Sequence, residues 1–554
     1  MRAVAVLILS AGLGTVLGGA AWAAEPRDWQ VKPVGKVHTI AAATQLSGPG
    51  SSVPGLPMTY DMSLFEWNWG GRQASFNGAG ITTNSNFPLV DGEALSANND
   101  LGLEATAPSG LVLGVQAEWY ALAGDRTVGR VFGEELPWDN FDRVGGALVP
   151  SRSNLDLEQG WLRYAQAPWS VQLTAGSLPP QTLPEFTRKT INHLKLGSLL
   201  WRPPITNASF FEKEDRKLEE GRHPVRGADL ILDYAYQPDR HLHLEFFSGQ
   251  TKPTPIAAID RLSWGGRFGA DVGRGNIGTT FVRADGDQPR AERQDLWAVD
   301  ASYPLLPRLT PYGVVARSSY TRGSQNLDGT AAVGGLAVKG PGSLDAKVQY
   351  QRVGENYDLI GTHKVEHYPS NLRGVSGEAN ALVGPAAMKA VVYHVQQMET
   401  NTRTGDTLFG DSYFPAIENS TPGTITVWRW VGELGPWGRV KPKGYIEQAH
   451  FRKDALADAN DIDKRVTSLV ATVGVTVTPH WSFEAGVRHL IATGRWQTLR
   501  FHHRQEIPEA SVTYRRGDTR ATMIYQAYDF EEAIAAGKNN YRGHQLLIEF
   551  RQLL

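Results

Sequence analysis

The chain has 554 residues, including 59 Gly, 18 Tyr and 16 Trp but no Cys, and its formal net charge is −2. The lack of cysteine excludes a disulfide framework, a thiolate metal site and a cysteine nucleophile. A net charge close to zero indicates no general attraction to nucleic acid or to anionic lipid, so no nucleic-acid partner is expected.

The N-terminus has the pattern of an export signal. Arg2 precedes the apolar stretch 3–17, and Ala21-Trp22-Ala23 fits the small-x-small cleavage rule, so residues 1–23 are predicted to be a signal peptide. A retained transmembrane anchor is the alternative, but the stretch is short and no stop-transfer pattern follows it. Residues 24–58 are predicted to form a periplasmic or luminal leader, because the part from 46 to 57 is rich in Gly and Pro.

Beyond this signal, the sequence contains no uninterrupted apolar stretch of the roughly 18 residues that a membrane-spanning helix requires. It contains instead a recurring unit, in which a run of alternating apolar and polar residues meets a short turn and a second alternating run follows. Side chains of a strand point to opposite faces with period two, so each run puts its apolar residues on one face. The clearest unit has Leu469, Ala471, Val473, Val475 and Val477 before the turn at Pro479, and Trp481, Phe483, Ala485 and Val487 after it.

Three features favour a transmembrane barrel for residues 59–554. Short turns alternate with long polar connections, and the short turns recur at a mean spacing of roughly 45 residues, which suits two strands of about 10 residues and their connections. Large aromatic residues lie close to the short turns, as in the interfacial girdles of barrels. These aromatic residues are Trp169, Tyr236, Tyr303, Tyr312, Trp437, Trp481 and Tyr514.

The predicted fold is therefore all-β: a transmembrane antiparallel up-and-down β-barrel of about 22 strands, within a range of about 16 to 24. A first strand is expected near residues 60–69 and a last one at 541–550. A soluble β-sandwich also alternates, and a propeller has a similar period. A propeller requires four strands in each blade and a repeated signature, whereas each unit here has two strong strands and no repeated motif.

The end of the chain resembles the closing strand of outer-membrane proteins. In the stretch 543–550, Leu546, Ile548 and Phe550 share one face, although four residues follow Phe550 and the last is Leu rather than an aromatic residue. Together with the export signal and the hairpins, this gives the chain a resemblance to Gram-negative porin-like β-barrels. The resemblance implies a location in the outer membrane, contact with its lipid, and a channel for small polar solutes or ions.

The long connection from residue 177 to 225 is a candidate constriction loop. Rings of opposite charge in a narrow pore tune its selectivity; the alternative is a solvated surface loop that neutralises itself. The candidate residues of this loop are Arg188, Lys189, Lys195, Arg202, Glu212, Asp215 and Arg216. Four charged residues in the alternating runs, Asp345, Lys347, Glu484 and Arg488, are predicted to face the lumen, either as a binding site or as simple solvation of its wall.

The sequence offers little for catalysis or metal binding. Asp458, Asn460, Asp461 and Asp463 form an acidic cluster, but Ile462 falls on a ligand position of an EF-hand loop that begins at Asp458, which disfavours calcium. Histidines are scattered and no G-x-S-x-G motif is present, so the chain is predicted to be no enzyme and to hold no metal or cofactor.

The predicted function is a diffusion channel of the outer membrane. Only about 35 residues lie between Ala24 and the first expected strand, too few for a folded plug domain. The alternative is a barrel sheath that encloses a multihaem cytochrome in an electron conduit. Because the chain has no C-x-x-C-H haem attachment motif, the haems would then belong to the periplasmic or surface partner.

Overall fold

The structure is a computed structural model. It describes residues 29–49, 74–76, 79–81, 91–124, 141–144, 147–150, 153–178, 225–251, 261–286, 292–322, 324–354, 372–397, 424–435, 437–453, 462–496, 499–532 and 540–554.

Twenty-two antiparallel strands form a single sheet. Their bounds are β1 Gln30–Ser47, β4 Gly92–Thr106, β5 Val112–Gly124, β8 Ser153–Gln166, β9 Trp169–Leu178, β10 Val225–Gln237, β11 Arg240–Thr251, β12 Arg261–Val272, β13 Gly275–Gly286, β14 Glu292–Ser302, β15 Leu309–Arg322, β16 Gln325–Lys339, β17 Asp345–Val353, β18 Leu372–Val383, β19 Ala386–Gln397, β20 Thr424–Leu434, β21 Val440–Lys453, β22 Ile462–Thr476, β23 Trp481–Trp496, β24 Leu499–Arg516, β25 Thr519–Glu532 and β26 Tyr541–Leu553. Two small hairpins, β2–β3 (Ala74–Phe76 and Ala79–Ile81) and β6–β7 (Phe141–Val144 and Ala147–Pro150), form separate two-stranded sheets.

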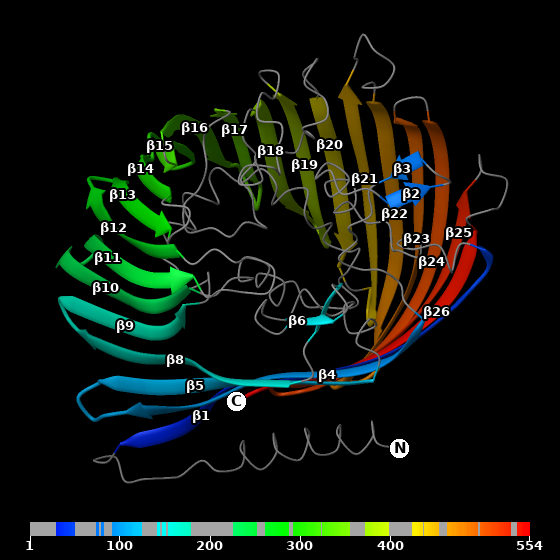
Figure 1. The fold of residues 1–554 in the computed structure, drawn as a ribbon, viewed down its shortest axis with the longest axis horizontal. Helices are drawn as coiled ribbons and strands as arrows, with labels where there is room; N and C mark the ends of the chain where they lie inside the picture. Colours follow the sequence, from blue (N-terminus) through cyan, green and yellow to red (C-terminus); the bar gives the residue numbers. More distant parts are fainter. Residues whose placement is uncertain are drawn as a thin grey trace.

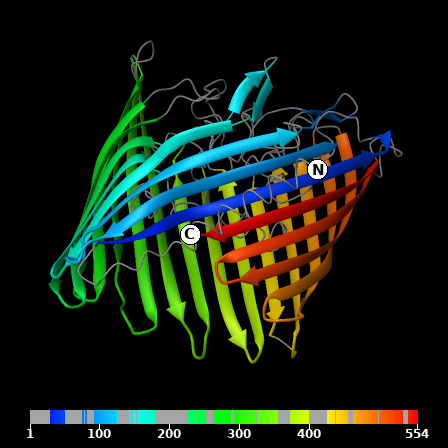
Figure 2. The same cartoon turned by 90° about the horizontal axis from the view of Figure 1, so that it is seen from below.

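The large sheet closes into a ring. Strands adjacent in the chain pair with each other from β8 to β26, β4 pairs with β5 and β5 with β8, and β1 pairs with β4 on one side and with β26 on the other. Figure 1 follows the ring by colour, and Figure 2 shows the blue β1 beside the red β26. Closure leaves no open edge, so every strand has a partner on both sides, as the hydrocarbon of a membrane requires. The predicted all-β barrel of about 22 strands is confirmed.

The connections at one end of the barrel are short. The turn between β24 and β25 contains only Gly517 and Asp518, and Gly517 takes a φ of +57°, the left-handed conformation that such tight hairpin turns require. The N-terminus of β1 and the C-terminus of β26 lie at this same end, because Gln30 opposes Thr106 and Lys36 opposes Leu553. In outer-membrane barrels the short turns are on the periplasmic side.

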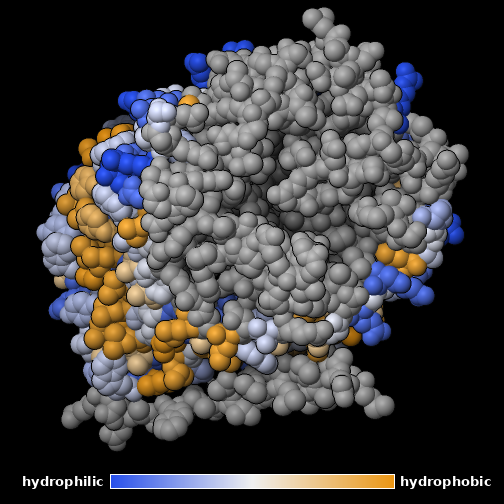
Figure 3. Space-filling view, in the orientation of Figure 1, coloured by the Kyte–Doolittle hydropathy of each residue, from blue (hydrophilic) through white to orange (hydrophobic). Residues whose placement is uncertain are grey.

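The two faces of the wall differ as the alternation predicts. On β23, Trp481 and Phe483 point outward and are 48% and 41% exposed, whereas Arg488 and Leu490 point inward and are 7% and 2% exposed. Similar outward apolar residues recur around the ring, and Figure 3 shows them as orange patches on the outer side of the wall. Among the described residues, no helix is long and apolar enough to span a membrane.

Two sequence expectations need correction. The predicted leader 24–58 is wrong for residues 30–47, which form β1, so the barrel begins before residue 59. Tyr312 was expected in the aromatic girdle, but it faces inward, where its hydroxyl donates to Gln349 Oε1 at 2.9 Å. The predicted signal peptide and the strand expected near residues 60–69 lie outside the described residues.

Candidate functional site: the charged wall of the lumen

Cationic side chains from four neighbouring strands form a row on the inner face of the barrel, which we call the basic row. Arg515 of β24 opposes Arg520 of β25, Arg520 opposes Arg551 of β26, and Arg551 opposes His38 of β1. Residues opposed in register share a face of the sheet, so these four side chains lie side by side. Arg515 stands just before the Gly517 turn, which places the row at the short-turn mouth of the lumen.

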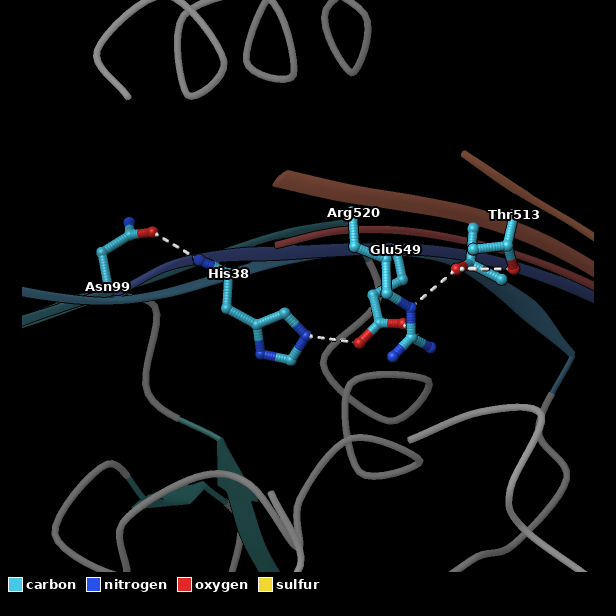
Figure 4. A network of polar contacts seen from close by, with 6 residues as sticks. His38, Asn99, Thr513, Arg520 and Glu549 are labelled. Carbon is cyan, nitrogen blue, oxygen red and sulfur yellow. Dashed lines mark hydrogen bonds and ion pairs between the residues drawn. The ribbon is translucent and has the colours of Figure 1, made fainter. Parts of the chain in front are cut away.

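A single carboxylate, Glu549, links the middle of the basic row. It is 2% exposed, its Oε1 atom lies 2.9 Å from His38 Nε2, and its Oε2 atom accepts a hydrogen bond from Arg520 at 3.3 Å. Asn99 Oδ1 accepts the backbone N–H of His38 at 3.1 Å, which fixes β1 at this point (Figure 4). Within the described residues, the row places three guanidinium groups and one imidazole side by side near Glu549, and such a concentration of cationic groups favours anions in the adjacent lumen.

A second set of inward residues, the acidic sector, lies on β10 and β11. It comprises Asp229, Asp233, Glu245 and His243. His243 Nδ1 lies 2.6 Å from Asp233 Oδ1, and His243 Nε2 lies 3.5 Å from Glu245 Oε2. Asp229 is 1% exposed, and its Oδ1 atom has no hydrogen-bond partner among the described residues. The described contacts therefore bring one imidazole beside two of the three carboxylates.

Arg267 of β12 sets the boundary of the acidic sector. It directly opposes Glu245 in register, but its guanidinium group binds Asp300 of β14 through two hydrogen bonds of 2.5 and 2.7 Å. Two parallel N–H···O bonds are the preferred geometry of an arginine–carboxylate pair. Arg267 is thereby paired with Asp300 rather than with Glu245, which it opposes in register.

The four residues predicted to face the lumen are on the inner face but are not assembled into one site. Lys347 of β17 has its Nζ atom 4.9 Å from the centre of the Tyr312 ring, and Asp345 is exposed near the end of the same strand. Glu484 of β23 lies 3.5 Å from Lys443, and Arg488 is buried farther along β23. Since β17 and β23 are six strands apart, these residues form two separate groups.

The candidate constriction residues Arg188, Lys189, Lys195, Arg202, Glu212, Asp215 and Arg216 lie outside the described residues. Their role in a constriction stays a prediction.

Sequence reasoning missed both charged sets. Part of the basic row could have been recognised in the sequence. Arg515 and Arg520 flank the Gly517 turn symmetrically, and both occupy polar positions of the alternating runs. His38 could not be found in this way, because its strand was assigned to the leader. The acidic sector was visible as Asp229, Asp233 and Glu245 at the polar positions of their alternating runs. Nothing in the sequence indicates which of these carboxylates is the most deeply buried or which has an oxygen atom without a hydrogen bond.

Comparison with known proteins finds similarity only at the level of architecture. No family model matches the chain, and no curated protein does. Among solved structures, the translocation pore of the P pilus usher PapC has 8% identity and a TM-score of 0.40, with 94% of this chain and 100% of that chain covered. An anion-selective porin from Comamonas acidovorans has 9% identity and a TM-score of 0.29, with 95% and 100% covered. OccK3 of Pseudomonas aeruginosa has 9% identity and a TM-score of 0.33, with 94% and 96% covered.

Similarity this low assigns no function, and the structure of the wall itself decides the class. An even number of antiparallel strands forms a closed ring, with apolar side chains on its outer face and charged side chains on its inner face. The N-terminus of β1 and the C-terminus of β26 both lie at the end with the short turns. The chain is an outer-membrane β-barrel. This barrel has the porin-like form expected of a protein in the outer membrane of a Gram-negative bacterium.

Proposed function

We propose that the barrel is a diffusion channel for small polar solutes or ions, without enzymatic activity, metal or cofactor. The observation that carries the proposal is the inner wall, where charged groups of both signs line a closed ring of 22 strands. Barrels of this size enclose a lumen wide enough for solutes.

The separation of charge along the wall supports a substrate bias. The basic row and the acidic sector lie on different strands, so a solute meets opposite fields on different sides of the lumen. Fixed charges on low-dielectric walls focus the field and raise the local concentration of counter-ions. The same proposal includes Arg188 and Lys189, as residues of a loop that narrows the route of solutes through the lumen.

The test is ion current through the purified barrel in planar bilayers. Stable open-channel current and a measurable reversal potential in a KCl gradient are expected. Neutralising the basic row by Arg515→Gln with Arg551→Gln should shift the preference away from chloride, and Asp233→Asn should shift it away from potassium. The matched control is Asp328→Asn, because Asp328 is on the outer face beside Arg317.

Two outcomes overturn the proposal. One is the absence of current from barrels that show folded mobility in gels. The other is copurification of a haem protein that blocks the current, which would establish the sheath of a multihaem partner instead. Neutralising Arg188 and Lys189 tests the constriction separately, since unchanged selectivity in that variant removes the loop from the pathway and leaves the wall.

A further inference from the structure

The outer face of the wall changes character toward the end with the long connections. On β17, Val348 and Tyr350 are 55% and 50% exposed, and the next outward residue is Arg352. On β18, the outward Val375 is 47% exposed and is followed toward the same end by Arg373. The apolar surface therefore stops at these two arginines, and Tyr350 occupies the level at which aromatic residues meet lipid headgroups.

Arg352 and Arg373 directly oppose each other across β17 and β18, and both are exposed. Like charges directly opposed on neighbouring strands destabilise a sheet. The NH2 group of Arg373 donates to Gln396 Oε1 at 3.2 Å, and within the described residues neither guanidinium has a carboxylate partner. The pair thus concentrates two positive charges at the edge of the apolar surface.

Four other arginines on the outer face have carboxylate partners. Arg283 binds Asp295 at 2.6 Å, Arg317 lies 3.3 Å from Asp328, and Arg542 lies 3.4 Å from Asp529. Arg504 likewise pairs with Glu506. The pair on β17 and β18 differs from these, which makes it a candidate for an anion supplied from outside the chain.

The position of the pair identifies the anion. The long connections of outer-membrane barrels are extracellular, so the pair is at the outer leaflet, directly above exposed apolar side chains. An amphiphile with an acyl portion and an anionic headgroup can contact both surfaces at once. Guanidinium groups bind phosphate through paired hydrogen bonds, which lysine cannot match.

We propose that Arg352 and Arg373 bind the phosphate of a phosphorylated outer-leaflet lipid, with its acyl chains against Tyr350 and Val375. The lipid neutralises the opposed guanidinium groups and fixes the height of this sector of the barrel in the membrane. The site is on the outer face and is independent of the proposed channel function.

The test measures lipid binding to the purified full-length barrel by native mass spectrometry, with diphosphorylated lipid A as the probe. The Arg352→Gln, Arg373→Gln double variant should bind lipid A at least about tenfold more weakly than the unaltered protein, because both charge-assisted pairs are lost. The matched control, Arg283→Gln with Arg317→Gln, removes the same charge from partnered sites and should retain binding within about twofold.

Three further arms separate the sources of binding. Dephosphorylated lipid A should bind as weakly to the unaltered protein as lipid A binds to the double variant. Inorganic phosphate at the same concentration should not compete, because it lacks acyl chains to contact the apolar surface. The Arg352→Lys, Arg373→Lys variant should recover part of the affinity through charge alone.

Equal binding of lipid A to the double variant and the unaltered protein overturns the proposal. Equal losses in the double variant and the control also overturn it, since they show dependence on net charge alone. Folding of each variant is verified by heat-modifiable gel mobility, and the channel current of the double variant should be unchanged.

Discussion

Glu549 and Asp229 are both almost completely buried on the inner face of one wall, yet their surroundings are opposite. Glu549 lies in the basic row and accepts contacts from His38 and Arg520. Asp229 lies in the acidic sector, where its Oδ1 atom finds no hydrogen-bond partner in the part of the chain that the structure describes. Both side chains point inward from a strand of the ring and are similarly buried, so neither burial nor the alternation of the strand distinguishes them.

The difference between them comes from the neighbouring strands. Glu549 meets cations because β25 and β1 bring Arg520 and His38 beside it. Asp229 meets Glu245 because β11 places a second carboxylate nearby, and the closest arginine in register, Arg267, binds Asp300. Lateral pairing therefore determines whether a buried charge stabilises the barrel or strains it.

The largest effect is expected from Glu549→Gln. The substitution leaves His38 and Arg520 without their shared carboxylate, and removal of one partner of a buried ion pair costs about 3–5 kcal/mol. The free energy of unfolding, measured by urea titration of barrels in lipid vesicles, should fall by that amount. A loss below about 1 kcal/mol would show that the buried contacts of Glu549 do not stabilise the wall.

A smaller effect of opposite sign is expected from Asp229→Asn. The amide has nearly the same shape and removes a buried charge that repels Glu245, so the unfolding free energy should rise by about 1–3 kcal/mol. Asp233→Asn is the control, because it weakens the 2.6 Å contact with His243 and should not stabilise the barrel. Destabilisation by Asp229→Asn would contradict the inference that the buried charge of Asp229 is unfavourable in the acidic sector.

The selectivity difference between the two sectors should weaken with salt. The Debye length falls from about 10 Å at 0.1 M to about 3 Å at 1 M, so each sector then acts only on ions that pass close to it. The shift in reversal potential caused by Arg515→Gln with Arg551→Gln should shrink accordingly when the mean KCl concentration is raised tenfold. A shift independent of salt would indicate a change of pore shape rather than of field.

The smallest effect is expected on the outer face, from Arg317→Gln. Arg317 and Asp328 are 65% and 58% exposed, and exposed ion pairs contribute about 0–1 kcal/mol. Urea titration should show a loss within that range. A larger loss would place this pair in a less polar environment than its exposure indicates.

The site was less predictable from sequence than the fold. The two-residue alternation of the strands correctly places four charged residues on the polar inner face, because this period is a local property of a strand. These residues are Asp345, Lys347, Glu484 and Arg488. The alternation does not indicate which inward charges contact each other, because that depends on which strands are neighbours and on their register. The four residues consequently divide between β17 and β23, while the basic row is assembled from strands at opposite ends of the chain.

The sequence by itself determined the architecture: alternating runs, short turns and interfacial aromatics required a closed barrel of about 22 strands, because strand period and turn chemistry are local. Only the tertiary structure decided how the barrel closes. Residues 30–47 become β1 because β26 and β4 supply partners on both sides, and His38 meets Glu549 across 511 positions of the chain. Such pairing is nonlocal, and no pattern within β1 alone indicates it.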